Sequence, residues 1–143
     1  MTALTPNFDA SRADARQTLV AHRLAQAIGE GTLSVHYQPE VDLQSLEVLS
    51  FEALCRWQDA ELNQVTPDEF IAVAEAKGLI SLLGCEILRQ VMGDMPQILI
   101  KWPKVRVAIN VSGIELAQAQ FAEQFLGMVN KANPEFASHL ELE

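Results

Sequence analysis

Apolar and polar residues alternate most regularly between residues 48 and 57, which predicts a β-strand. One face of this strand is wholly apolar and consists of Leu49, Phe51, Ala53, Cys55 and Trp57. The other face carries Ser50, Glu52, Leu54 and Arg56. Glu52 and Arg56 are about 13 Å apart at about 3.3 Å per residue, so they do not neutralise each other. Either a metal ion and a phosphate satisfy these two charges, or the face is half exposed and water does.

The same reading divides the rest of the chain into alternating helices and strands. A helix is expected from Asp9 or Ser11 to about Ile28, and Pro39 is expected to end the strand that follows. Thr66 and Ser112 are each placed to cap a helix, and Pro96 is expected to end or kink any helix that continues past it. Residues 94–103 are either a last helical piece or an irregular segment. The predicted elements are a helix over 9–28, strands over 33–39 and 48–57, helices over 66–77 and 79–92, a strand over 105–112, a helix over 112–130 and a strand over 140–143.

Strands that alternate with helices favour a mainly parallel α/β sheet, although the first two strands are close enough in sequence to be antiparallel neighbours. Functional sites in such folds lie at the carboxyl ends of the strands. The sequence places a polar residue at each predicted strand end, namely Gln38, Glu52, Asn110 and Glu143. These four residues are therefore the candidates for a common site.

Composition limits the range of functions. The 143 residues, 49% hydrophobic and 20% charged, suit one globular domain. A net charge of -9 argues against a nucleic acid polymer as partner. Cys55 and Cys85 have no metal or redox spacing and suit a reducing compartment, and no uninterrupted apolar stretch has membrane-spanning length. We therefore expect a cytoplasmic protein with no membrane partner.

Several motifs, taken in order, resemble the EAL domain of bacterial cyclic diguanylate phosphodiesterases from about residue 20 onward. They are Tyr37-Gln38-Pro39, Glu52-Ala53-Leu54-Cys55-Arg56-Trp57, Thr66-Pro67-Asp68-Glu69-Phe70-Ile71, Ala74-Glu75, Gly78-Leu79-Ile80, Asn110-Val111-Ser112 and Leu140-Glu141-Leu142-Glu143. The resemblance implies about the first half of a TIM-like (β/α)₈ barrel with an antiparallel first strand, over residues 19–143, preceded by a lead and helix start over 1–18. It also implies hydrolysis of cyclic diguanylate with Mg²⁺ or Mn²⁺. In that family's terms Glu52, Asn110 and Glu143 are expected metal ligands, and Gln38, Leu54 and Arg56 are expected substrate contacts.

The family's paired aspartates, catalytic lysine and later metal-binding glutamate have no counterpart in these 143 residues. No catalytic set is complete, so we expect the isolated chain to be inactive and to bind cyclic diguanylate weakly or not at all. A non-catalytic EAL-like module that binds a nucleotide or a protein is the alternative, and an unrelated α/β domain is a third reading. Open sheet edges favour a homodimer, unless the N-terminal helix covers the open side.

Overall fold

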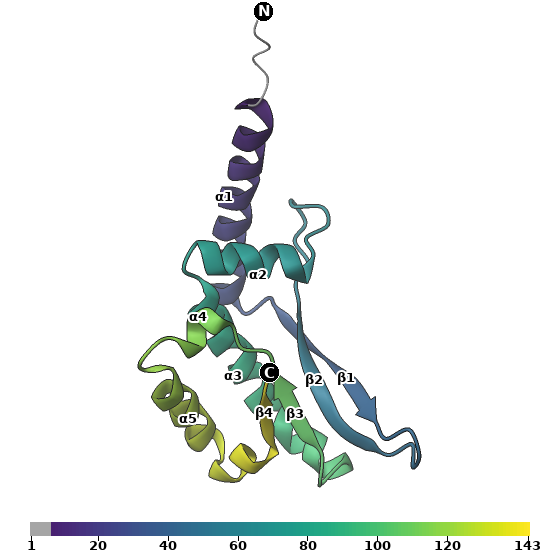
Figure 1. Ribbon diagram of the computed structural model, residues 1–143. Helices are drawn as coiled ribbons and strands as arrows, with labels where there is room; N and C mark the ends of the chain where they lie inside the picture. Colours follow the sequence, from purple (N-terminus) through teal and green to yellow (C-terminus); the bar gives the residue numbers. More distant parts are fainter. Residues whose placement is uncertain (1–6) are drawn as a thin grey trace, which may run out of the picture.

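The structure, a computed structural model, describes residues 7–143, and it describes side chains from residue 10 onward (Figure 1). It is a mixed α/β fold with one four-stranded sheet. Its elements, in chain order, are α1 (Asn7–Glu30), β1 (Ser34–Val41), β2 (Val48–Arg56), α2 (Pro67–Ala76), α3 (Ile80–Lys101), β3 (Arg106–Ile109), α4 (Gly113–Leu116), α5 (Phe121–Ala132), the 3-10 helix η1 (Pro134–His139) and β4 (Leu140–Leu142).

The strand order is β1-β2-β3-β4. β1 pairs with β2 in antiparallel orientation, whereas β2–β3 and β3–β4 are parallel, so the predicted antiparallel first pair is confirmed. In register, Gln38 lies opposite Glu52, and Glu52 lies opposite Ala108. Paired residues project from the same side of a sheet, and so do residues two apart along a strand. The four polar candidates of the sequence therefore share one face.

The opposite face of the sheet is apolar and packs against α3 and α5. Ala53, Val107 and Ile109 form a buried cluster there with side chains of these helices, including Leu88 and Val129. The β-branched and small residues that alternate along the strands are those that suit a pleated, buried surface. This packing fixes the strands from one side and leaves the polar side chains on the other.

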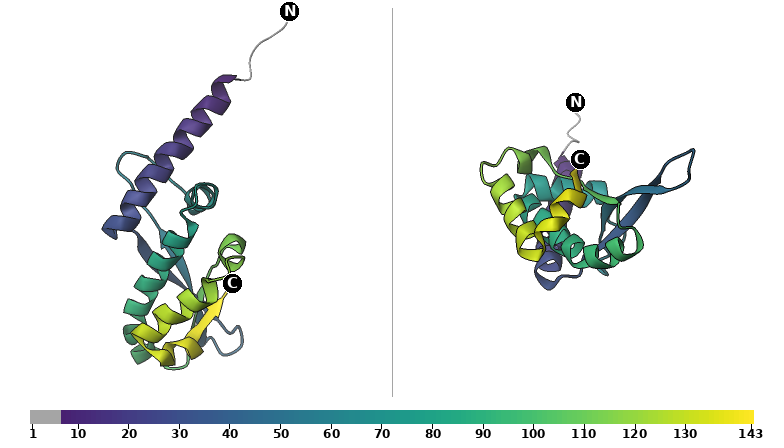
Figure 2. Two further views of the ribbon diagram at one scale, coloured as in Figure 1. Left: turned by 90° about the vertical axis from the view of Figure 1, so that its left-hand side faces the viewer. Right: turned by 90° about the horizontal axis from the view of Figure 1, so that it is seen from below.

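The second half of helix α1 belongs to the main body of the molecule. Val20, Leu24 and Ala27 are buried in a second cluster with Trp57 and Phe70, whose rings meet edge to face at 5.8 Å. Described residues before Val20 are exposed, and Figure 1 and the left view of Figure 2 show the first turns of α1 projecting away from the other elements. This placement does not support the alternative that the N-terminal helix covers the open side of the sheet.

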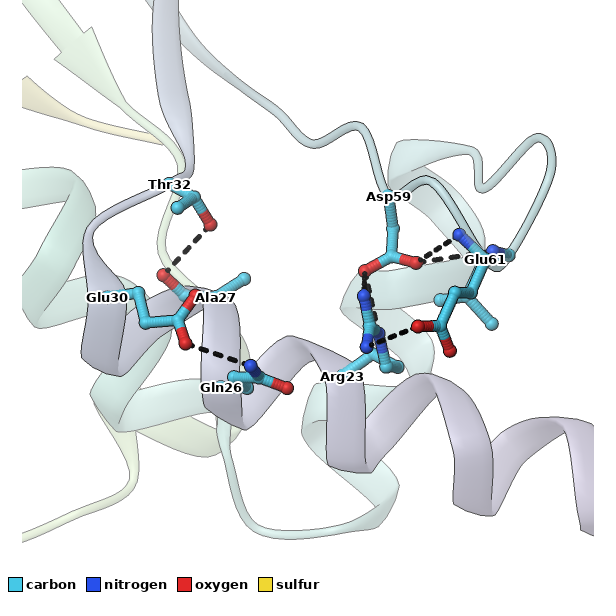
Figure 3. Close-up of polar contacts among 8 residues, drawn as sticks. Arg23, Gln26, Ala27, Glu30, Thr32, Asp59 and Glu61 are labelled. Carbon is cyan, nitrogen blue, oxygen red and sulfur yellow. Dashed lines mark hydrogen bonds and ion pairs between the residues drawn. The ribbon is translucent and has the colours of Figure 1, made fainter.

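Arg23 ties α1 to the connection between β2 and α2 (Figure 3). Its Nε donates to Asp59 Oδ2 at 2.8 Å, and its Nη1 lies 3.2 Å from Glu61 Oε1. Asp59 Oδ1 accepts the backbone N–H of Glu61 at 2.9 Å, which makes the connection turn. Arg16, which lies earlier in α1, pairs with Glu69 of α2 through a 3.0 Å contact between Nη2 and Oε2. The helix and the strand–helix connection are thus held together by charge as well as by apolar contact.

Two expectations about the hairpin were wrong. β1 does not end at Pro39 but continues to Val41, because β1 is an edge strand and a proline there removes no hydrogen bond to a further strand. Leu49, placed by alternation on the buried face, is 52% exposed. It lies near the start of β2, where the hairpin extends beyond the rest of the molecule (Figure 2).

Three boundaries also differ. α3 continues through Pro96 to Lys101, because Met95 is buried and Ile98 partly buried against the sheet, and this burial offsets the roughly 3 kcal/mol that an internal proline costs. The single helix expected over 112–130 is two helices, with a turn in which Gln118 Nε2 donates to Ser81 Oγ of α3 at 2.9 Å. The strand expected over 105–112 is only the four residues of β3.

Two of the four expected strand-end positions are not strand ends. Gln38 lies inside β1 and Glu52 lies in the middle of β2. Asn110 directly follows β3, and Glu143 directly follows β4, as expected. The four residues still lie on one face because the register, rather than the strand termini, aligns them.

Candidate functional site

Glu52, Asn110 and Glu143 lie together on the polar face of the sheet. Asn110 Nδ2 donates a hydrogen bond to Glu52 Oε1 at 2.8 Å. Glu143 is placed beside Asn110 by the backbone, because its N–H donates to Ile109 O at 3.0 Å and its carbonyl accepts the N–H of Val111 at 2.8 Å. Residues from three consecutive strands of the parallel part of the sheet therefore converge at one point.

This convergence concentrates negative charge. Loss of hydration, and then the charges of Glu52, Glu40 and Glu141, raise the pKa of the Glu143 carboxyl. One of the neighbours, Glu40, also accepts a hydrogen bond from the hydroxyl of Ser50. A bound cation would offset the repulsion among these carboxylates.

The donors fit a hard divalent cation, because carboxylate and carboxamide oxygens are the ligands that Mg²⁺ and Mn²⁺ prefer. Asn110 now turns its Nδ2 toward Glu52, so its amide would rotate to present Oδ1. Within residues 7–143 no group of three or more His, Cys, Asp or Glu side chains is close enough to hold a metal ion. Two carboxylates and one carboxamide therefore do not by themselves make the acidic cluster of a complete metal site.

The three expected substrate contacts flank this cluster. Gln38 is exposed and lies opposite Glu52 on the neighbouring strand. Leu54 and Arg56 follow Glu52 along the same face of β2, and the Arg56 Nη1 donates to the carbonyl of Cys55 at 2.9 Å. No carboxylate of the described residues is within ion-pair distance of Arg56, so its guanidinium can bind an anion.

Leu54, Arg56 and Asn110 line a hollow of about 400 Å³ at the end of the sheet. Its other walls come from α2, α3 and the segment after β3, and include Ile71, Glu75, Gly84, Ser112 and Glu115. The sequence predicted only a helix cap at Ser112, and nothing in it pointed to a role in the site for Glu75 or Gly84. The Ser112-x-x-Glu115 capping box was the one sequence signal that pointed to this wall.

Comparison with known proteins identifies the class to which this fold and site belong. The family model for the EAL domain matches residues 21–143, so the chain belongs to the EAL domain family. Members of this family that act as phosphodiesterases are metal-dependent. The resemblance to the EAL domain that the sequence motifs suggested is thereby confirmed.

Among particular relatives, the chain is 34% identical over 121 residues to the cyclic di-GMP phosphodiesterase PA2567 of Pseudomonas aeruginosa, covering 84% of this chain and 20% of that protein. It is 34% identical over 113 residues to the cyclic di-GMP phosphodiesterase PdeR of Escherichia coli, covering 79% of this chain and 17% of that protein. A solved structure of the PaMucR phosphodiesterase with c-di-GMP superposes with a TM-score of 0.74 at 30% identity, covering 87% of this chain and 50% of that one.

The chain thus spans about a fifth or less of these curated relatives and half of the solved phosphodiesterase chain. The solved EAL structures are TIM-barrel-like, and the four-stranded sheet corresponds to part of such a barrel. Within the described residues no helix is long and apolar enough to cross a membrane.

Proposed function

We propose that these 143 residues supply part of the metal and substrate site of a cyclic diguanylate phosphodiesterase. The observation that carries the proposal is the convergence of Glu52, Asn110 and Glu143 on one face of the sheet, beside a hollow that Arg56 lines. The family membership and the phosphodiesterase relatives give this arrangement its substrate class.

Each residue has a distinct role in the proposal. Glu52 and Glu143 hold a Mg²⁺ or Mn²⁺ ion through carboxylate oxygens, and Asn110 adds a carboxamide oxygen. When bound, such an ion activates water and offsets the charge of the phosphoryl group. The guanidinium of Arg56 binds a phosphate of cyclic diguanylate, Leu54 gives an apolar contact, and Gln38 gives a polar one on the far side of Glu52.

The isolated chain is inactive in this proposal. The described residues hold no complete acidic cluster for a metal, and their hollow is only part of the pocket of a whole EAL domain, because the chain spans half of the solved phosphodiesterase chain. A partial pocket covers little of a ligand's surface, so the affinity for cyclic diguanylate is low as well. Incubation of the purified chain with cyclic diguanylate and Mn²⁺ is expected to give no linear dinucleotide. Turnover that Glu52→Ala abolishes would overturn this expectation, and sub-micromolar binding in calorimetry would overturn the expectation of low affinity.

The metal part of the proposal is tested by the binding of Mn²⁺ alone, followed by the loss of the free-ion signal in electron paramagnetic resonance. Wild-type protein is expected to bind Mn²⁺ more tightly than Glu52→Gln, which removes one charged ligand. Glu47→Gln is the matched control, because Glu47 is exposed in the β1–β2 connection and the change removes the same charge. Equal weakening by both variants would show only a general effect of net charge and would contradict the assignment of Glu52.

We also propose that the chain forms a homodimer in a reducing, cytoplasmic environment. β1 and β4 are the two edges of the sheet, and exposed edge strands tend to pair. The apolar side chains of Leu116, Leu126 and Leu142 are about half exposed around a hollow near β4. A twofold contact that buries these groups is the simplest arrangement. Light scattering at micromolar concentration tests it, and a stable 15.8 kDa monomer would exclude the dimer.

A further inference from the structure

The segment that follows Asn110 is held by side chains from two helices, α2 and α4. Ser112 Oγ accepts the backbone N–H of Ile114 at 3.2 Å and donates to a carboxylate oxygen of Glu75 in α2. Glu115 Oε2 in turn accepts the backbone N–H of Ser112 at 3.1 Å. The hydroxyl and the backbone N–H of Ser112 are therefore both hydrogen-bonded. They fix Ser112, two positions after Asn110, to α2 and α4.

Gly84 of α3 makes this arrangement possible. A Cβ atom at Gly84 would overlap Oε1 of Glu115 and lie 3.2 Å from its Cδ. The Glu115 side chain is only 6% exposed, so its carboxylate lies directly against the backbone of α3. Gly93, nine residues later in the same helix, has nothing within 4 Å of its Cβ position. Of the two glycines of α3, only Gly84 therefore has a neighbour that an added methyl group would displace.

The buried carboxylate is costly to keep in this position. Burial raises the pKa of Glu115, the Ser112 N–H opposes that rise, and the charge of Glu75 adds to it. A surface position would avoid this cost. What the buried carboxylate stabilises is the backbone between β3 and α4, to which Asn110 belongs.

We propose that Gly84 and Glu115 are positioning residues, which hold the backbone after β3 so that the Asn110 side chain meets Glu52. Asn110 is itself exposed, so no packing around its side chain keeps it there. Its backbone is fixed on the β4 side by the Val111 N–H, which donates to Glu143 at 2.8 Å, and on the α4 side by the Ser112 N–H, which donates to Glu115. Only the significance of this placement for a metal rests on the proposed function, whereas the placement itself does not.

The first experiment follows the side-chain amide of Asn110 by nuclear magnetic resonance, assigned by its loss in Asn110→Ala. Gly84→Ala is expected to shift or broaden this signal, because the new methyl group displaces the Glu115 carboxylate. Gly93→Ala is the matched control, with the same change in the same helix and no group to displace. Urea unfolding of each variant separates this local effect from loss of the fold.

Two changes at Glu115 keep the inference testable if Gly84→Ala does not fold. Glu115→Ala removes the acceptor of the Ser112 N–H and is expected to perturb the Asn110 amide in the same way. Glu115→Gln keeps an oxygen acceptor of the same size and is expected to restore the wild-type signal. An Asn110 amide that is the same in wild type and in Glu115→Ala would overturn the inference.

Titration with Mn²⁺ alone separates the inference from the proposed function. In wild type and Gly93→Ala, Mn²⁺ is expected to broaden the backbone signals of Glu52 and Asn110. In Glu115→Ala the same broadening is expected to need roughly tenfold more Mn²⁺, as for other residues that orient a metal ligand. If wild type shows no broadening, the metal function fails while the amide measurements still decide the positioning role. Equal broadening in wild type and Glu115→Ala would refute the positioning role and leave the metal function standing.

Discussion

Leu24→Ala is expected to destabilise the protein strongly, because the second half of α1 is part of the core. Leu24 is completely buried in the cluster that contains Trp57 and Phe70. Alanine has a higher helix propensity than leucine, so the helix itself is not weakened by the change. What is lost is the contact between α1 and the segment that leads from β2 to α2.

The magnitude follows from the burial. Truncation of a fully buried leucine to alanine costs about 2.7–5 kcal/mol, which combines the lost transfer free energy with the cavity left behind. The total stability of a domain is only about 5–15 kcal/mol, so this change removes a large fraction of it. The matched control is Leu19→Ala in the same helix, where leucine is 45% exposed and the expected cost is roughly 0.5 kcal/mol or less.

The assay is urea unfolding followed by circular dichroism, with the slope and the midpoint fitted for wild type, Leu24→Ala and Leu19→Ala. A lower midpoint with an unchanged slope for Leu24→Ala alone would confirm that α1 is an integral part of the domain from about Val20 onward. The same result would support the division of the chain at residues 18 and 19 that the sequence predicted. Equal midpoints for the two variants would refute the reasoning, because α1 would then contribute no core contact.

Three further predictions rest on separate features. A thiol reagent at pH 8 is expected to label Cys85 in the folded protein and Cys55 only after unfolding, because Cys85 is exposed and Cys55 is buried. Burial raises the pKa of both thiols, that of Cys55 to about 11, and mass spectrometry of the labelled peptides measures the difference. Gly78→Ala is expected to cost about 1–2 kcal/mol in urea unfolding, because Gly78 has a φ of +73°. Partial burial raises the pKa of the Asp59 carboxyl, but the hydrogen bond from Arg23 outweighs it and the net pKa is lowered. A folded pKa below the unfolded one stabilises the protein above about pH 4. Wild type is therefore expected to be more stable to unfolding than Arg23→Gln above this pH, and the difference is expected to vanish as pH falls through the folded pKa. An advantage that persists at lower pH would contradict this cause.

Much of the fold was available from local sequence. The alternation around Glu52, the capping residues Thr66 and Ser112 and the β-branched run before Asn110 each determine a local structure that the tertiary fold retains. These signals act over about ten residues or fewer, so they survive in any compact arrangement that buries the apolar face. The family motifs share this property, because they are short segments read in order.

Where long-range contacts outweighed local preference, the sequence was misleading. Pro96 lies inside a helix because Met95 and its neighbours are buried against the sheet, and Leu49 is exposed because the hairpin extends beyond the core. Neither outcome is encoded within a few residues. Both depend on which elements pack together, and tertiary burial is worth more than a single helix or strand preference.

The candidate site divides in the same way. The residue types of Glu52, Asn110 and Glu143 could be read from the sequence, but their meeting depends on a strand register that joins residues 58 and 33 positions apart. The seating of Glu115 against Gly84 could not be read at all, because a glycine that leaves room for a distant carboxylate looks the same in sequence as one that does not. Local sequence determined which groups are present, and only the packing of α2, α3 and the sheet decided which of them touch.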